Sequence, residues 1–214
     1  GVAKKEHIAN KKYIVYPYVR EADVLWSKIV WRMIDLREKV NLPLYYPTMN
    51  IDGRKSLINV LLESIAKGDL TAYDQGANDE FSMRISFEEA NKQMGAGVEM
   101  MESEEEGTDS VEVQIAARTT EVKRLLLKEV WYFDKKYSRM DVRIIGICPI
   151  REAVDGDRVS MKKTFWIYYP EARPILAQHE VFNTKNDSQR QSFEDLFSKR
   201  QFNSYIYQEA NPYN

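Results

Sequence analysis

Leu125-Leu-Leu-Lys-Glu-Val-Trp-Tyr-Phe133 and Met140-Asp-Val-Arg-Ile-Ile-Gly-Ile-Cys148 lie on either side of a polar segment, Asp134 to Arg139. Both runs are rich in the β-branched and aromatic residues that favour strands. Two such runs around a polar loop predict a β-hairpin with a loop of several residues. We expect this hairpin to lie in a central antiparallel sheet.

Three shorter segments also predict strands. Val111, Val113 and Ile115 alternate with polar or small neighbours, which is the two-residue period of a half-buried strand. The apolar segment from Lys163 to Tyr169 predicts a further strand, and Leu70 to Tyr73 a short one. The second half of the chain is therefore expected to be rich in strands.

The segment from Glu21 to Val40 predicts a helix, because its apolar side chains recur at spacings of three and four. Leu42-Pro43 ends the pattern, since the residue before a proline disfavours the α region. We expect Trp26 to lie in the core. The apolar stripe consists of Ala22, Trp26, Ile29, Met33, Leu36 and Val40.

Three further segments predict helices. One runs from Arg54 to Lys67, with Asp52 as its N-cap and Gly68 as its stop. Phe87 to Met94 is a weaker candidate, and the last helix is expected from Asp187 to Tyr207. Strand and aromatic content together favour a central antiparallel sheet, and with flanking helices this predicts an α+β protein. The inner face of the last helix is expected to hold Phe193, Leu196, Phe197 and Phe202.

The chain divides into an arm, one folded domain and a short tail. Residues 1–20 begin with a polar, basic tract and continue as Tyr13-Ile-Val-Tyr-Pro-Tyr-Val19, whose proline cannot donate to a strand ladder. We expect an extended basic and aromatic arm over 1–20, a single α+β domain over 21–210 and a tail over 211–214. Residues 95–110 are acidic, contain three glycines and lack an apolar period, which predicts a long loop.

The composition argues against several classes of protein. Hydrophobic residues make up 43% of the 214, which is typical of a folded chain. The 31 basic and 33 acidic residues give no strong positive field for nucleic acid. No apolar run approaches the roughly 20 residues that span a bilayer. The lone cysteine, Cys148, allows no internal disulfide and suits a cytoplasmic and a periplasmic protein nearly equally. Because the chain begins at Gly1, we expect a processed start, and the loss of an export signal stays open.

Sequence motifs for catalysis are absent. The nine glycines form neither GxGxxG nor GxxxxGK[ST], and His7 and His179 form no HExxH. Cys148 precedes a proline at the end of an apolar strand, which favours a buried, inert thiol over a nucleophile paired with His179. We therefore predict no catalytic residue, no cofactor and no metal site.

One catalytic alternative stays open, a metal-dependent hydrolase with a dispersed carboxylate site. Such a site needs acidic residues to hold the ion and a lysine nearby. The spacing is not specific, and exposed charges on the outer face of a sheet are the simpler interpretation. The residues concerned are Lys128, Glu129, Asp134 and Asp141.

Tyrosines gather toward both ends of the chain, where no core can form from local residues alone. Aromatic anchors are enriched at interfaces between proteins, so we expect these rings to contact a partner or a neighbouring copy. The other interpretation is that both ends fold back on their own subunit as edge strands. The candidate interface residues are Tyr13, Tyr16, Tyr18, Tyr205 and Tyr207, with Tyr213 beyond them.

Four blocks of sequence, in the same order along the chain, resemble the GldN/PorN family. They span most of the chain from Val24 to Asn211, and the tract from Gln93 to Thr120 lies outside any match. The blocks are Leu25-Trp-Ser-Lys-Ile-Val-Trp-Arg-Met-Ile-Asp-Leu-Arg-Glu-Lys39 with Asn41-Leu-Pro-Leu-Tyr-Tyr-Pro47, Lys128-Glu-Val-Trp-Tyr-Phe-Asp134 with Met140 to Arg151, Phe165-Trp-Ile-Tyr-Tyr-Pro-Glu-Ala-Arg-Pro174, and Phe193-Glu-Asp-Leu-Phe-Ser-Lys-Arg-Gln-Phe202.

This resemblance implies a non-catalytic periplasmic subunit of the type IX secretion and gliding machinery. It implies assembly with an outer-membrane lipoprotein of the GldK/PorK type into a large ring at the inner side of the outer membrane. It also implies contact with the trans-envelope subunit of the GldM/PorM type. The family carries an export signal, in keeping with the processed start expected above, and supplies no catalytic residue to carry over.

Overall fold

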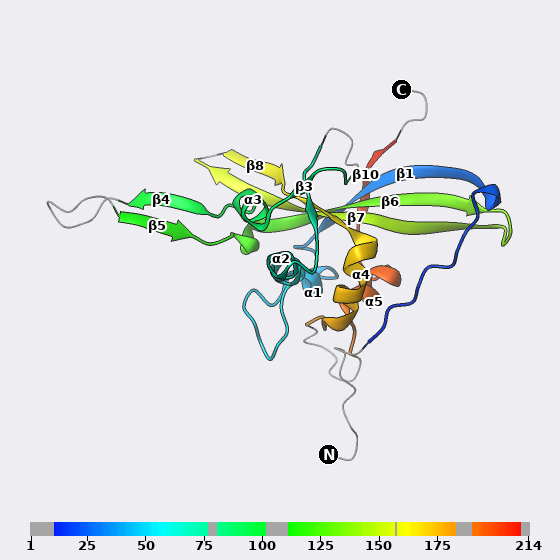
Figure 1. The fold of residues 1–214 in the computed structure, drawn as a ribbon, viewed down its shortest axis with the longest axis horizontal. Coiled ribbons are helices and arrows are strands. Elements are labelled where there is room, and N and C mark those ends of the chain that lie inside the picture. Colours follow the sequence, from blue (N-terminus) through cyan, green and yellow to red (C-terminus); the bar gives the residue numbers. More distant parts are fainter. Residues whose placement is uncertain (1–10, 77–80, 102–110, 157, 183–189, 211–214) are drawn as a thin grey trace, which may run out of the picture.

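An antiparallel sheet runs through the protein, and helices pack against it (Figure 1). The computed structural model describes residues 11–76, 81–101, 111–156, 158–182 and 190–210. The predicted α+β class, with a central antiparallel sheet, is confirmed. The strands are β1 (Val24–Asp35), β2 (Ala72–Tyr73), β3 (Arg84–Ile85), β4 (Gly97–Met101), β5 (Val111–Ile115), β6 (Val122–Asp134), β7 (Arg139–Asp155), β8 (Arg158–Lys163), β9 (Trp166–Tyr168) and β10 (Tyr205–Glu209). The helices are α1 (Leu42–Tyr45), α2 (Leu57–Lys67), α3 (Phe87–Gln93), α4 (Tyr169–Gln178) and α5 (Phe193–Ser198), with single 3-10 turns at Glu21–Asp23 and Thr119–Glu121.

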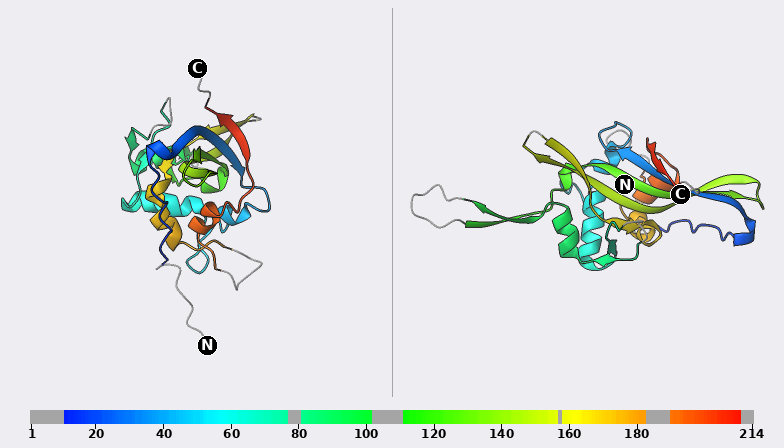
Figure 2. Two further views of the ribbon diagram at one scale, coloured as in Figure 1. Left: turned by 90° about the vertical axis from the view of Figure 1, so that its right-hand side faces the viewer. Right: turned by 90° about the horizontal axis from the view of Figure 1, so that it is seen from above.

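Eight strands form the main sheet, in the order β10-β1-β6-β7-β9-β2-β3 with β8 also paired to β7. The predicted hairpin is its centre, because β6 and β7 pair along the whole length of β6. Asp134 closes the turn: its Oδ1 accepts hydrogen bonds from the backbone N–H groups of Lys136, at 2.8 Å, and Tyr137, at 3.3 Å. The sheet is strongly curved when seen end-on (Figure 2, left).

The helix predicted over Glu21 to Val40 is wrong, because Val24–Asp35 forms β1. This strand lies between β6 and β10, so hydrogen bonds hold both of its edges. Ile34 packs into the main core, and Met33 packs into a second cluster. Burial on both faces is confined to the second half of β1, where Met33 and Ile34 are neighbours. A strand segment of this kind shows no strict alternation, so the apolar residues of β1 could also be fitted to a helical spacing. The predicted burial of Trp26 is wrong as well, since 46% of this residue is exposed.

The helix predicted over Asp187 to Tyr207 is replaced by a short helix and a strand. Residues 187–189 lie outside the described part of the chain, and α5 has six residues. It begins at a capping box in which Ser192 and Asp195 bond to each other's backbone N–H groups, at 3.2 and 2.9 Å. Arg200 takes a positive φ of 53°, which cannot continue a helix. The chain then reaches β1 and forms β10 beside it.

The loop predicted over residues 95–110 is partly wrong, because Gly97–Met101 forms β4 and pairs with β5 as a separate two-stranded ribbon. Residues 102–110 lie outside the described part of the chain. The strand predicted at residues 111–116 is confirmed as β5, although it joins this ribbon and not the main sheet. Figure 2 (right) shows the ribbon projecting from the body.

Other predicted elements are confirmed, with small shifts. The strands β2 and β9 and the helix α3 lie inside the segments predicted for them. The second predicted helix exists as α2, but its N-cap is Ser56 and not Asp52: the Ser56 side chain accepts from the Asn59 N–H at 3.3 Å. Gly68 ends this helix in the left-handed conformation, as predicted, with a φ of 79°. The strand β8 and the helix α4 were not predicted.

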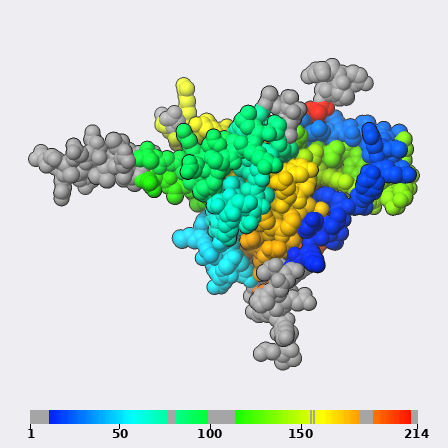
Figure 3. All heavy atoms as spheres, viewed as in Figure 1, coloured from blue at the N-terminus to red at the C-terminus, as the bar shows by residue number. Residues whose placement is uncertain are grey.

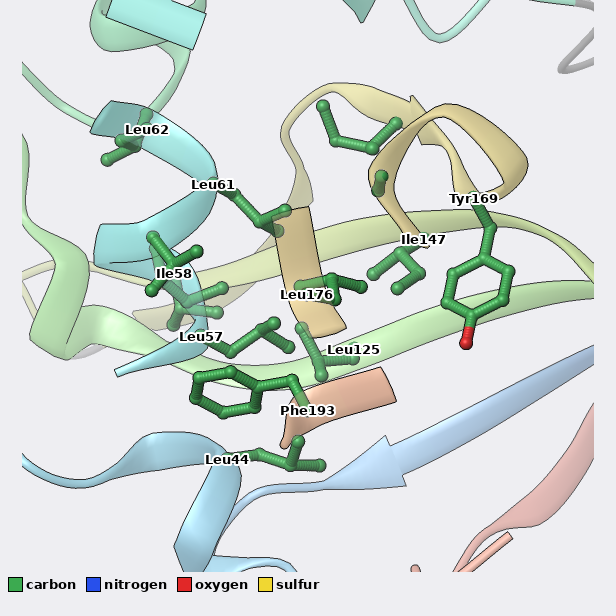
Figure 4. Packing of buried hydrophobic residues seen from close by; sticks show 14 of the residues in the cluster. Leu44, Leu57, Ile58, Leu61, Leu62, Leu125, Ile147, Tyr169, Leu176 and Phe193 are labelled. Carbon is green, nitrogen blue, oxygen red and sulfur yellow. The ribbon is translucent and has the colours of Figure 1, made fainter. Parts of the chain in front are cut away.

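The main core lies between the sheet and the helices α2, α4 and α5 (Figure 4). Leu57 and Leu61 of α2, Leu176 of α4 and Phe193 of α5 meet there over Leu125 of β6. All five side chains are fully buried. A second, smaller cluster forms around residues of opposite parity on the same strands: Met33, Tyr73, Leu126, Cys148, Ile150 and Trp166.

Candidate partner interface

The N-terminal arm, residues 11–20, lies across the surface beside α4 and α5 (Figure 3). Tyr13, Tyr16 and Val19 are half-buried, and the residues between them are exposed. A burial period of three is that of a polyproline II segment, and Arg20 has matching dihedral angles, φ −75° and ψ 145°. The arm therefore presents every third side chain to the body of the protein.

Arg173 of α4 is the centre of the surface on which the arm rests. Only 4% of its side chain is exposed, and its Nε and Nη2 donate to Glu194 Oε1 of α5 at 2.8 and 2.7 Å. The hydroxyl of Tyr169, at the start of α4, donates to the other oxygen of Glu194 at 2.5 Å. Both carboxylate oxygens of Glu194 accept hydrogen bonds in this buried ion pair, which offsets part of the cost of removing the charges from water.

The arm is held by contacts to its main chain and to its rings. Arg173 Nη2 donates to the carbonyl oxygen of Ile14 at 2.5 Å. The Arg173 guanidinium carbon also lies 4.0 Å from the Tyr16 ring centroid and 4.7 Å from that of Tyr13. Together these contacts place a cation on two aromatic rings.

Two further contacts fix the ends of the docked segment. Arg143 of β7 donates from Nη2 to the carbonyl oxygen of Pro17 at 2.6 Å. Lys11 forms an ion pair with Asp195 of α5. A space of about 350 Å³ remains between the docked arm, α4 and α5. We call the surface of α4, α5 and β7 on which the arm rests the groove.

Docking of the arm changes the ionisation of Tyr16. Burial raises the pKa of its phenol above the ordinary value of 10.0, and Glu194 adds to this, while Arg173 and Arg143 oppose it. The folded protein thus holds the phenolic proton more tightly than the unfolded chain does.

This shift predicts how stability depends on pH at the alkaline end. A raised folded-state pKa contributes stability that is intact below pH 10.0 and is lost as the pH rises through the raised value. We expect the free energy of unfolding in urea to fall more steeply above pH 10.0 for the parent than for Tyr16→Phe. Tyr18→Phe, at a position that is 90% exposed, is the matched control and should follow the parent. Equal slopes for the parent and Tyr16→Phe would show that the arm does not dock.

The five tyrosines predicted as interface residues fall into two groups. Tyr13 and Tyr16 contact Arg173 of their own subunit. Tyr18 is 90% exposed, and Tyr205 and Tyr207 of β10 are 52% and 51% exposed. The structure brings the first pair together and leaves the other three facing solvent, while Tyr213 lies outside the described residues.

The edge strand β10 is the second candidate surface. It is the outermost strand next to β1, and all five of its residues are exposed. Its outer backbone groups therefore form an edge of the kind that accepts a further strand. Backbone pairing with Val30 to Met33 and an ion pair between Lys28 and Glu209 hold β10 in place, and the register of the pairing shifts between Trp31 and Arg32.

The residues of the hydrolase alternative are not brought together. Glu129 is fully buried, and its carboxylate oxygens lie 2.8 Å from Arg200 Nη1 and 3.4 Å from Arg32 Nε. Asp134 closes the hairpin turn, and Asp141 accepts from the Tyr132 hydroxyl at 3.3 Å. Lys128 Nζ lies 5.6 Å from the Trp31 ring centroid and 5.7 Å from that of Phe81.

A metal centre finds no support in the described part of the chain, where no three His, Cys, Asp or Glu side chains group in a way that could hold an ion. Cys148 is fully buried, and His179 Nδ1 bonds to the carbonyl oxygen of Ile175 at 2.8 Å. His7 lies outside the described residues.

Sequence reasoning missed Arg173, Glu194 and Arg143, the residues that hold the arm. Arg173 and Glu194 are 21 positions apart, on two helices that only the tertiary fold brings together. Arg143 lies in a predicted strand, Glu194 inside a predicted helix and Arg173 in no predicted element, so none of them stands out from ordinary surface residues. The edge strand β10 did carry a signal, since Asn203-Ser204 followed by Tyr205-Ile-Tyr207 is typical of a turn and a strand.

Comparison with known proteins gives one informative match. None of the curated proteins searched matches the chain. Among the described helices, none combines the length and the apolar character required to cross a membrane. The family model described as "Gliding motility associated protein GldN" matches residues 19–214. Since that match covers nearly the whole chain, the protein belongs to the GldN family of gliding-motility-associated proteins.

Proposed function

We propose that this protein is a non-catalytic structural subunit of the type IX secretion and gliding machinery. In this proposal it works in the periplasm, at the inner face of the outer membrane. There it forms a ring complex with an outer-membrane lipoprotein of the GldK/PorK type and contacts a trans-envelope subunit of the GldM/PorM type. The observation that carries the proposal is the family match over residues 19–214.

The exposed apolar surfaces of the body support a role in assembly. A second such surface, besides β10, lies near the β6–β7 turn and crosses β1, β6 and β7. There Trp26 pairs with Phe133, and Phe133 pairs with Met140. Trp26 and Met140 are 46% and 49% exposed. Contiguous apolar surface of this kind commonly marks sites of contact between proteins.

The engaged state of the charged residues supports a structural role over hydrolysis. Glu129 is neutralised by two arginines, and Asp134 bonds to backbone groups of a turn. A catalytic metal needs ligands with free oxygen atoms and an open coordination position. These carboxylates are instead used to hold the sheet and its turn.

Co-purification with the lipoprotein tests this function. The two proteins are produced together, one copy is tagged, and the mass of the purified assembly is measured. We expect a stable complex of fixed stoichiometry that contains many copies of each chain. A protein that stays monomeric beside the lipoprotein would contradict the proposal. A stoichiometric transition metal in the purified protein would favour the hydrolase instead.

A further inference from the structure

The groove beside α4 and α5 contacts the arm at positions that are three residues apart. The contacted rings belong to Tyr13 and Tyr16, and the bonded carbonyl oxygens belong to Ile14 and Pro17. Each pair is three positions apart, which is one turn of a polyproline II helix. The groove is therefore matched to the backbone geometry of an extended segment.

Main-chain recognition is a large part of this match. A polyproline II segment makes no internal hydrogen bonds, so its carbonyl oxygens are free to accept from a partner. Arg173 and Arg143 supply the two donors, and charge-assisted hydrogen bonds of this kind are stronger than neutral ones. Arg173 is held rigidly by Glu194, so its guanidinium is already oriented before the segment arrives.

Side chains select which extended segment fits. Arg173 favours aromatic rings one turn apart, and Asp195 favours a lysine two positions before the first ring. The sequence Lys11-Lys-Tyr-Ile-Val-Tyr-Pro17 meets these requirements. Every copy of the protein thus carries both the groove and a segment that fits it.

We propose that the groove is an exchange site, in which residues 11–17 of one copy occupy the groove of the neighbouring copy within the assembly. This inference rests on the ring complex proposed above. Exchange keeps every contact of the docked arm, because the two copies are identical, and swapped elements are a low-cost route to association. A head-to-tail exchange can also close into a ring in which every contact between neighbours is the same.

The connection between the arm and β1 permits such an exchange. The carbonyl bond to Pro17 is followed by Tyr18, which is 90% exposed. Val19 is half-buried, and Arg20 after it is exposed and extended, so Tyr18 is the freest position for a rotation. A rotation in this short connection swings the arm away from its own body without breaking a strand of the sheet. In a dilute monomer the protein's own arm is favoured by its high effective concentration, and holding a neighbour nearby in a ring raises the effective concentration of the neighbour's arm as well.

Crosslinking across one contact separates the two arrangements. Lys11→Cys is placed in a tagged copy and Asp195→Cys in an untagged copy, because these residues form an ion pair between the arm and α5. The two copies are mixed during assembly with the lipoprotein and treated with a short bis-maleimide. Cys148 is fully buried, so the parent protein checks that the native thiol stays unreactive. A copy with Tyr18→Cys in place of Lys11→Cys is the control for random contact.

Arm exchange predicts a covalent dimer of tagged and untagged copies in the assembly, and its loss with the Tyr18→Cys control. A single chain that carries both Lys11→Cys and Asp195→Cys reports docking on the own body. If the complex forms, the mixture gives no dimer and the double variant gives only the intrachain product, exchange is overturned while the proposed function stands. If neither product forms, the groove is empty or holds a lipoprotein segment, and exchange is again overturned. If no complex forms with the lipoprotein, the proposed function fails, and exchange fails with it.

Discussion

Glu194→Ala is expected to lower the free energy of unfolding by about 3–5 kcal/mol, because it leaves one charge of a buried ion pair without its partner. Only 4% of the Arg173 side chain is exposed, and two of its nitrogens bond to Glu194. The Tyr169 hydroxyl loses its acceptor in the same variant. Urea unfolding followed by tryptophan fluorescence measures the difference.

An exposed ion pair gives the matched control for this variant. Arg20 bonds to Asp23 at 2.8 Å, but 66% of the Arg20 side chain is exposed. Exposed pairs of this kind contribute little to stability because solvent screens them, so Arg20→Ala should leave stability nearly unchanged. Glu194→Gln keeps one acceptor oxygen and should lie between the two. If Glu194→Ala lowers the free energy of unfolding no more than Arg20→Ala does, the Arg173 guanidinium is accessible to water.

Trp166→Ala should cost about 3–5 kcal/mol, the usual range for removing a buried aromatic side chain. Trp166 is fully buried, and its ring lies 5.9 Å from that of Phe81 in an edge-on arrangement. Added bulk on the neighbouring strand would clash with the same rings, since a Cβ at Gly146 would lie 2.4 Å from Phe81 Cζ and 3.0 Å from Trp166 Cε3. Chemical denaturation checks the expected loss.

Trp26→Ala makes the same chemical change at a position that is 46% exposed. We expect a clearly smaller loss than for Trp166→Ala, because part of the Trp26 ring is already in contact with water. The same variant should weaken assembly if the row of Trp26, Phe133 and Met140 meets a partner. Equal losses for the two tryptophan variants would contradict the partial exposure of Trp26 and show that its ring is buried.

The parts of the fold that were predicted correctly depend on neighbours in the sequence. The β6–β7 hairpin and the Gly68 stop of α2 follow from turn chemistry and local residue preference. The α3 helix follows from the Ser86 and Glu89 capping box. In each of these, the residues that decide the structure lie within a few positions of one another.

The errors arise where distant segments decide the structure. Residues 24–35 become a strand because β6 and β10 hydrogen-bond to both edges, and no local signal records that. Their helical spacing does not follow burial, since Trp26 is 46% exposed while Met33 is buried. The arm site was missed for the same reason, because Arg173 is oriented to bind the arm only by Glu194 of another helix. The tyrosine positions were a useful guide to the arm. Which rings dock and which stay exposed depends on the position of Arg173.

The position of β10 also limits when the sheet can be completed during synthesis. Val30 of β1 pairs with Glu129 and with Glu209, so the first strand to be synthesised waits for residues from the middle and from the far end of the chain. Pairing across such sequence separations is intrinsically slow. A nascent or C-terminally clipped chain that lacks residues 205–209 exposes β1 as an open edge, which is prone to self-association. The edge of β1 is therefore covered only when the chain has been synthesised through its last strand, β10.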